Sequence, residues 1–219
     1  LKASEKKGRS EGKYKTKYDK CTIECYDYFG DKIKTFQNKE EAAKLWAEGL
    51  KEVGKDSVEL ELLNYDGDSA KKMGEYLKEQ METTLEGLTL SLNQQPFQNK
   101  LDIQAKGDFD ISYSGWGPDY KDPMTFLDMF TTGNGNNHTA YSSEDYDKLI
   151  KDASTTLLDD LEARDKAMAD AEKLLIEEDA VIAPLYQRGA SFLMKDKVKG
   201  LLSHSFGGDY SYKWVSIEE

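Results

Sequence analysis

The sequence predicts an α/β fold: a mostly parallel sheet of β-α-β units, flanked by helices, with additional strands late in the chain. Apolar and other residues alternate, as in strands, over residues 57–63, 88–93 and 109–113. Stretches with helical spacing of apolar residues separate these strands. A helix between two strands is the usual connection in a parallel sheet, because parallel neighbours need a long crossover.

Three helices are expected before and between these strands. Asn38 and Glu41 resemble a capping box, and apolar residues then recur at helical spacing as far as Gly54. The turn at residues 66–69 is expected to cap the second helix. The third helix is expected to begin near Pro96 and to continue through Phe97, Leu101 and Ile103.

The second half of the chain is expected to contain three more helices. Pro123 opens a short one, Ser143 opens the next, and residues 160–178 form a long amphipathic one. An asparagine- and glycine-rich loop at residues 132–138 separates the first two. Strands are then expected over residues 180–186, 190–194 and 212–217.

Composition and charge narrow the class of protein. The 219 residues allow one domain or two, and we expect one. Only 38% of residues are hydrophobic, but 13 Tyr, 8 Phe and 3 Trp supply the aromatic surface of a folded protein. The net charge of −12 argues against nucleic acid or an anionic membrane as a partner and mildly favours cationic ligands. No apolar run approaches the roughly 20 residues of a membrane span.

The first 35 residues are expected to form a basic, partly irregular segment. Residues 1–20 carry a net charge of +5, which leaves −17 for the remainder. We interpret this segment as a solvated end left by cutting the chain from a larger protein, with an electrostatic tether to an acidic surface as the alternative. Cys21 and Cys25 are too few for a zinc site, and we interpret them as structural or incidental.

The most informative stretch follows the third predicted strand. Residues 114–123, called the signature loop below, begin where a strand of the parallel sheet ends, which is where ligands usually bind. Gly115 and Gly117 leave room for another backbone, Trp116 offers an aromatic wall, and Asp119 adds a negative charge. Such a loop suits a cationic end group, for example the α-ammonium of a peptide.

Residues 114–127 resemble the signature of the oligopeptide-binding proteins of ABC importers, which are peptide-type extracellular solute-binding proteins. Three further stretches match that family in the correct order: residues 41–49, 136–150 and 183–186. Four ordered matches are more specific than any single motif. The resemblance implies one lobe of a type II periplasmic-binding-protein-like fold, with residues 36–219 as the C-terminal, ligand-binding lobe and the N-terminal lobe missing.

The resemblance also implies a function. Family members bind extracellular oligopeptides in a cleft between two lobes and deliver them to the permease subunits of an ABC transporter. A binding protein rather than an enzyme is therefore expected, without cofactor, metal or nucleic acid. The implied location is the extracellular or periplasmic side of the cytoplasmic membrane, with a lipid anchor in the full-length parent.

The resemblance assigns roles to residues of the signature loop. Asp119 matches an aspartate that contacts the amino terminus of the peptide, although it could instead cap the helix after Pro123. Gly115 and Gly117 match positions whose backbone pairs with the peptide like an added strand. Trp116 could contact the ligand or anchor its own loop. Tyr113 stands where some relatives have a basic residue that meets the peptide carboxylate.

Two candidate residues lie outside the signature loop. His138 could contact the ligand, but a single histidine in an asparagine-rich loop is more often solvated or stabilises a turn. Tyr186 matches a strand near the cleft, and packing in the core is an equal alternative.

Two other classes of function are compatible with parts of the sequence. A glycan hydrolase would use Trp116 as a sugar platform and Asp119 with Asp110 or Asp122 as its pair of carboxylates. That reading leaves the other three motif matches unexplained. A peptide- or pheromone-sensing protein, or an adhesion protein, would keep the fold and use it for another partner.

Overall fold

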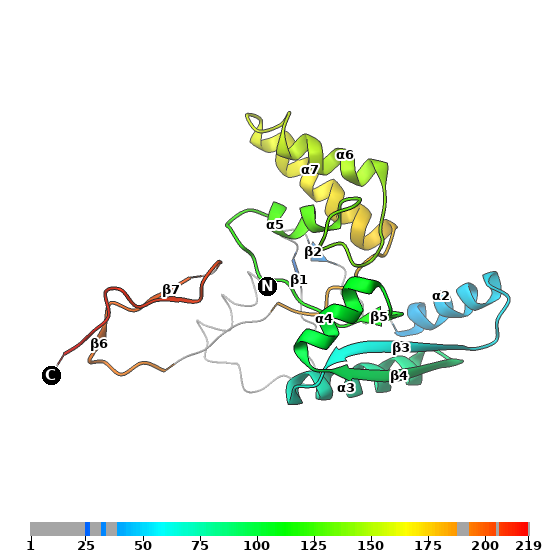
Figure 1. The fold of residues 1–219 in the computed structure, drawn as a ribbon. Coiled ribbons are helices and arrows are strands. Elements are labelled where there is room, and N and C mark those ends of the chain that lie inside the picture. Colours follow the sequence, from blue (N-terminus) through cyan, green and yellow to red (C-terminus); the bar gives the residue numbers. More distant parts are fainter. Residues whose placement is uncertain (1–24, 27–31, 34–38, 188–192, 205, 219) are drawn as a thin grey trace. The chain divides into compact units, whose positions relative to one another are not determined.

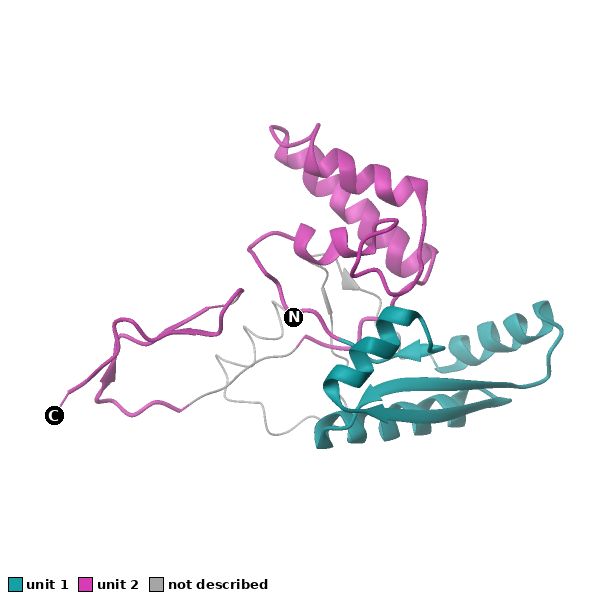
Figure 2. Cartoon of the chain, in the orientation of Figure 1, with its two compact units in different colours: residues 1–114 teal, residues 115–219 magenta. Residues whose placement is uncertain are grey.

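The structure is a computed structural model that describes residues 25–26, 32–33, 39–187, 193–204 and 206–218. The chain forms two compact units, Leu1–Ser114 and Gly115–Glu219 (Figure 2). The expected boundary after residue 35 lies among residues outside the described ranges and stays a prediction, and Cys21 also lies outside them.

The first unit contains a three-stranded parallel sheet with the order β4-β3-β5 (Figure 1). Its strands are β3 (Val58–Tyr65), β4 (Leu88–Gln95) and β5 (Ile111–Ser112). Its helices are α2 (Lys39–Glu52), α3 (Asp68–Thr84) and α4 (Phe97–Lys106). A short antiparallel pair, β1 (Cys25–Tyr26) and β2 (Lys32–Ile33), precedes them. The predicted parallel sheet with helical crossovers is confirmed.

The two faces of the sheet are covered by different helices, α3 on one side and α4 on the other (Figure 1). Leu62 and Leu90 are buried on the α3 side, where alternate residues of paired strands share a face. The close approach of α3 to β3 on that side needs a glycine in the helix. A Cβ at Gly74 of α3 would lie 2.7 Å from the Nδ2 of Asn64, whose amide donates to the carbonyl of Ala70.

β5 is shorter than the strand expected over residues 109–113. It contains only Ile111 and Ser112, which pair with β3. The backbone N–H of Glu61 in β3 donates instead to the carboxylate of Asp110, at 2.8 Å. The side chain of Asp110 thus accepts the N–H that a backbone carbonyl would accept in a longer strand.

Two features of the helices in this unit differ from expectation. The turn before α3 caps it only through its backbone: Gly67 is the N-cap, and no side chain accepts a hydrogen bond there. The expected helix α2 is present, but Leu45 and Val53 of its apolar face are exposed. The indole N–H of Trp46 reaches the carbonyl of Glu86 at 2.8 Å and ties α2 to the turn before β4.

The second unit is mainly helical over its first half. It contains α5 (Met124–Leu127), the 3₁₀ turn η1 (Asp128–Phe130), α6 (Glu144–Ser154), α7 (Leu161–Lys173) and the π-helical end η2 (Leu174–Glu178). The expected helix starts at Ser143 and Asp160 are confirmed, and the side chains of these two residues accept the N–H groups of Tyr146 and Ala163. Tyr146 is buried between these helices, and its hydroxyl donates to the carbonyl of Leu127 at 2.6 Å.

The late strands are fewer and shorter than expected. The strand expected over residues 180–186 is wrong, because this segment is irregular and the N–H of Val181 bonds to the helical carbonyl of Leu175 instead of a strand. Part of the strand expected at residues 190–194 lies outside the described residues. Of residues 212–217 only Ser216–Ile217 is a strand. The observed antiparallel pairs are β6 (Val198–Lys199) with β9 (Ser216–Ile217), and β7 (Leu202–Ser203) with β8 (Tyr210–Ser211).

None of the helices that the structure describes combines the length and the apolar character needed to cross a bilayer.

Candidate functional site

The signature loop begins at the carboxyl end of the parallel sheet, as predicted. The N–H of Tyr113 donates to the carbonyl of Leu63 at 2.9 Å, the last backbone bond between β3 and the residues after β5. Ser114 then ends the first unit and Gly115 begins the second. The predicted site residues therefore divide between the units, with Tyr113 in the first and the others in the second.

Gly115 and Gly117 are exposed and face open space. A Cβ added at either position would meet no atom within 4 Å, and neither residue has a positive φ. The loop thus needs glycine here neither for its backbone conformation nor for packing within the described chain. The open space leaves the peptide groups accessible to a second backbone.

Asp119 lies at the exposed end of this stretch. Its backbone N–H donates to the Oγ1 of Thr125 at 3.0 Å, which holds the residue against α5. Its carboxylate has no hydrogen bond or ion pair with any residue that the structure describes. Trp116 is also exposed, with 41% of its surface accessible. Both side chains are available for contact with a ligand.

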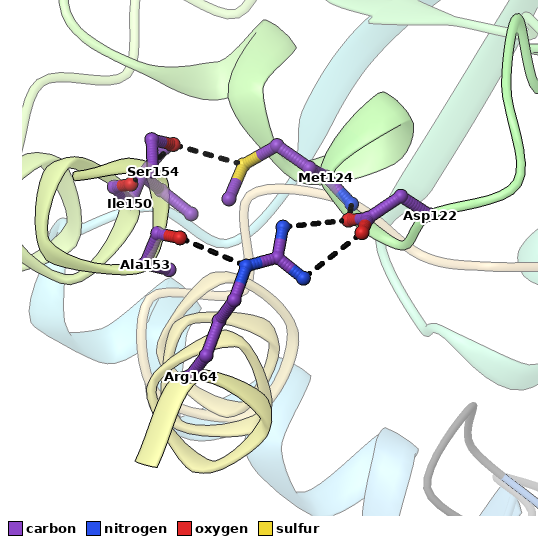
Figure 3. A network of polar contacts seen from close by, with 6 residues as sticks. All are labelled: Asp122, Met124, Ile150, Ala153, Ser154 and Arg164. Carbon is purple, nitrogen blue, oxygen red and sulfur yellow. Dashed lines mark hydrogen bonds and ion pairs between the residues drawn. The ribbon is translucent and has the colours of Figure 1, made fainter. Parts of the chain in front are cut away.

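At the start of α5, the carboxylate that accepts a helix N–H belongs to Asp122 and not to Asp119. The Oδ1 of Asp122 accepts the N–H of Met124 at 2.9 Å. The same carboxylate forms a bidentate ion pair with Arg164 of α7, at 2.9 and 3.0 Å (Figure 3). The Nε of Arg164 donates to the carbonyl of Ala153 at 2.9 Å. Arg164 thereby joins the end of the signature loop to both α6 and α7.

The environment of Asp122 keeps it ionised. Partial burial raises the pKa of this carboxyl, but the hydrogen bonds from Arg164 and Met124, with the charge of Arg164, outweigh burial and leave the pKa below its ordinary value. The hydrogen bonds to Asp122 and the negative charge of that carboxylate raise the pKa of Arg164, against the opposing effect of burial.

Tyr120 and Asp128 form a second polar contact under the loop. Burial raises the pKa of Tyr120, and the charges of Asp128, Asp122 and Asp119 raise it further. Burial likewise raises the pKa of Asp128; the hydrogen bond from Tyr120 opposes this effect, and the charge of Asp119 adds to it. Because Arg164 neutralises Asp122, the remaining negative field around Asp119 favours a cationic ligand group.

His138 and Tyr186 are placed elsewhere in the second unit. His138 is half-buried in the loop between η1 and α6, and no hydrogen bond or ion pair links its ring to any described residue. The neighbouring Asn137 organises this loop: its Nδ2 contacts the carbonyls of Phe130, Thr131 and Tyr141 at 3.2, 3.1 and 2.8 Å. Tyr186 is 57% exposed in the irregular segment after η2, so the alternative in which it packs in the core does not hold within the described chain.

A surface pocket of about 470 Å³ lies between α6 and the α7–η2 helix, and none of the predicted site residues lines it. Its wall carries both acidic and basic side chains, and Lys173 is paired with Glu178. A wall of mixed, paired charges selects no particular ligand, so the signature loop remains the better candidate. In the described part of the chain, no group of three or more His, Cys, Asp or Glu residues is arranged to hold a metal ion.

Sequence reasoning missed the roles of three residues that shape these loops. Arg164 carried no local signal, because its partner Asp122 is identified only by the fold. Asn137 lies in the asparagine-rich loop that was predicted, and its partners are close in sequence, but the pattern does not show which asparagine makes the contacts. Lys100 carried a local signal, because it lies at helical spacing from Phe97 and Gln104, on the stripe of α4 that faces the sheet. The structure buries Lys100 and places its ammonium 2.7 Å from the hydroxyl of Ser114.

Comparison with known proteins agrees with this geometry. Residues 11–138, more than half of the chain, match the model of the bacterial extracellular solute-binding proteins, family 5. The chain is 37% identical over 209 residues to a dipeptide-binding protein of Lactococcus lactis subsp. cremoris, with 94% of this chain and 36% of that protein covered.

Two solved structures are similar. The substrate-binding domain of an oligopeptide ABC transporter from Bacillus anthracis has a TM-score of 0.78 and 42% identity, and the match covers 89% of this chain and 39% of that one. OppA of Listeria monocytogenes bound to peptide has a TM-score of 0.73 and 41% identity, covering 83% and 34%.

The family match, the relatives and the folds agree, so the resemblance seen in the four sequence motifs is confirmed. The chain spans about a third of the length of these relatives, which is consistent with a single lobe. The chain belongs to the bacterial extracellular solute-binding proteins, family 5.

Proposed function

We propose that this chain binds oligopeptides at the signature loop and that the whole protein delivers them to the permease of an ABC transporter. The α-ammonium of the peptide pairs with Asp119, and its backbone bonds to the open peptide groups of Gly115 and Gly117. Trp116 covers the adjoining part of the ligand. The rest of the protein closes over the bound peptide by a hinge motion.

The single observation that carries this proposal is the contrast between two carboxylates three residues apart. Asp122 accepts three hydrogen bonds, two from Arg164 and one from Met124. Asp119 accepts none from any residue that the structure describes, although its backbone is held in place by Thr125. A fixed, exposed and unpaired carboxylate beside accessible backbone is suited to a ligand ammonium.

Backbone pairing would explain how such a site accepts peptides of many sequences. Main-chain hydrogen bonds are the same for every residue type, and neither loop glycine has a side chain that restricts the approach. The solved relative from Listeria monocytogenes is a complex with peptide. This mode of binding is the one the loop geometry favours.

The contacts of the other carboxylates count against a glycan hydrolase. Its two candidate partners for Asp119 already have structural roles. Asp110 bonds to the backbone of Glu61, and Asp122 pairs with Arg164. The similar proteins are solute-binding proteins, which fits a binding function rather than catalysis.

The proposal is tested by an NMR titration of the ¹⁵N-labelled 219-residue chain with trialanine and with N-acetyl-trialanine. Trialanine is expected to shift the amide signals of Gly115, Gly117 and Asp119, and acetylation is expected to remove the effect because it removes the ammonium. NMR is chosen because it detects millimolar binding, which a site lacking its second lobe is expected to retain.

Asp119→Asn provides the matched test of the carboxylate, with the exposed Asp159→Asn as control. Asp119→Asn is expected to weaken trialanine binding about tenfold, since a charge-assisted contact contributes roughly 1.5 kcal/mol, and Asp159→Asn is expected to leave it unchanged. Equal binding by the acetylated peptide, or by Asp119→Asn, would show that the ammonium is not bound at this residue.

A further inference from the structure

Lys100 is a buried cation without an anionic partner in the described chain. Its side chain on α4 is 0% exposed. Its ammonium donates to the Oγ of Ser114 at 2.7 Å and to the Oε1 of Gln104, and it lies 4.7 Å from the ring centre of Tyr65. Tyr65 in turn stacks on Phe97, with ring centroids 5.7 Å apart. Neutral dipoles and one aromatic face therefore solvate the charge.

Folding alone does not account for a lysine at this position. Removing a cation from water is costly, and neutral partners offset only part of that cost. An apolar side chain of similar length would fill the same space under Tyr65 without this penalty. The charge of Lys100 instead acts on Ser114, the residue whose hydroxyl its ammonium contacts.

Ser114 is the residue at which the sheet ends and the signature loop begins. The last backbone bond to β3 is made by Tyr113, and the contacts of the next residue, Ser114, are made by its side chain. The Ser114 hydroxyl contacts Gln104 at 3.1 Å as well as Lys100, and Ser112 contacts Gln104 at 3.2 Å. The end of α4 thus fixes the last residue before Gly115.

We propose that Lys100 is a positioning residue for the signature loop: its ammonium holds Ser114 and thereby sets the orientation of the peptide groups from Gly115 to Asp119. Lys100 itself does not contact the ligand, because it is fully buried. The effect of this orientation on peptide affinity rests on the proposed function. The effect on the loop does not depend on it.

The protonation of Lys100 gives the contact a pH dependence. Burial lowers the pKa of Lys100 to about 8. The groups that face it are Gln104 from α4, Tyr65 from β3 and Ser114 after β5, and Tyr65 is the titratable one among them. Above pH 8 the amine has one donor fewer and no charge for the ring of Tyr65. Its hold on Ser114 then weakens.

The first experiment follows the ligand-free chain by ¹H–¹³C NMR between pH 6.5 and 9.5, because carbon-bound protons do not exchange with water. The Cε signal of Lys100 reports its own titration, and the Cα signal of Gly115 reports the loop. Both are expected to titrate with one midpoint near pH 8. Different midpoints, or a Gly115 signal that does not titrate, would overturn the proposal.

Two variants test the route from Lys100 to the loop. In Ser114→Ala, Lys100 is expected to titrate still, but Gly115 is expected to lose its transition because the link is removed. In Lys100→Met, both transitions are expected to disappear. A Gly115 transition that persists unchanged in either variant would contradict the proposal, and Ser114→Ala keeps the test decisive if Lys100→Met fails to fold.

The second experiment measures trialanine affinity at pH 7 by NMR titration. Lys100→Met is expected to weaken binding five- to tenfold, and combining it with Ser114→Ala is expected to add little, because both remove the same contact. Lys78→Met is the control, since Lys78 is a lysine of the same unit that contacts the carbonyl of Leu90 and the carboxylate of Glu82 but no residue of the signature loop. If trialanine fails to bind the wild-type chain, the proposed function fails, while the ligand-free titration still decides the role of Lys100.

Discussion

At the scale of single residues, the second unit uses similar side chains for different purposes. The carboxylate of Asp122 is paired with Arg164, whereas that of Asp119 has no partner among the described residues, although only two residues separate them. The difference arises from Arg164, whose guanidinium is held by the carbonyl of Ala153 and can therefore meet one carboxylate in a bidentate geometry. Arg164 thus decides which aspartate of the loop remains free.

Replacing Asp122 by asparagine tests this role. Asn keeps an acceptor for the N–H of Met124 but loses the charge opposite Arg164, so we expect the free energy of unfolding at pH 7 to fall by about 2 kcal/mol. Chemical denaturation of both proteins measures this difference. The exposed Asp159→Asn serves as the control and is expected to change stability very little.

The pH dependence of the same pair has a defined sign. The pKa of Asp122 in the folded chain lies below its ordinary value of 3.8, so the unfolded chain takes up the proton first as the pH falls. The stabilisation by Asp122 is therefore complete above pH 3.8 and is lost as the pH falls through the folded-state value. The stability gap between wild type and Asp122→Asn is expected to be constant from pH 5 to 7 and to narrow below pH 4. A gap independent of pH would assign it to packing rather than charge.

At the scale of elements, the sequence predicted what depends on local pattern. The helices that begin at Ser143 and Asp160 were predicted, because the start and the apolar spacing of a helix involve residues close in sequence, as do the two N-cap bonds observed there. Strands were harder, because a strand needs a partner distant in sequence. Residues 180–186 have a strand-like pattern but bond to the end of a helix, and β5 is shortened where Asp110 replaces a backbone acceptor.

The candidate site likewise has one part that the sequence predicted and one part that it did not. Gly115, Trp116, Gly117 and Asp119 were predicted as a group because they are consecutive, and their exposure is consistent with contact to a ligand. The supports of the loop were not predicted. Arg164 lies 42 residues from Asp122, and Ser114 lies 14 residues from Lys100 across a strand. Neither pair can therefore be recognised from the spacing of residues along a helix or a strand.

The loop between η1 and α6 provides a prediction at this scale. The side-chain amide of Asn137 contacts three carbonyls of its own loop, and alanine would leave these carbonyls without that donor. We expect Asn137→Ala to lower the free energy of unfolding by about 2 kcal/mol and to speed hydrogen exchange over residues 131–141. The control is Asn136→Ala, because Asn136 is exposed and contributes to the turn through its backbone N–H and carbonyl, which alanine keeps. Equal effects of the two variants would contradict this role for Asn137.

At the scale of the whole molecule, charge is the property that acts beyond individual contacts. The chain carries −12 overall, although its first 20 residues are basic. Such a field attracts cationic ligands over a distance set by the ionic strength, about 30 Å at 0.01 M salt and 10 Å at 0.1 M. The carboxylate of Asp119 would then bind the attracted ammonium group at short range.

This field predicts how peptide binding depends on salt. Trialanine amide carries one positive charge and no carboxylate, so raising NaCl from 10 to 200 mM is expected to weaken its binding about threefold by screening the field. Trialanine, whose two charges cancel, is expected to respond less, because the field acts on its carboxylate in the opposite direction. NMR titration of the Gly117 amide signal measures both affinities. An equal response of the two peptides would mean that the net charge of the chain has no part in binding, and that Asp119 recognises the ammonium only at contact.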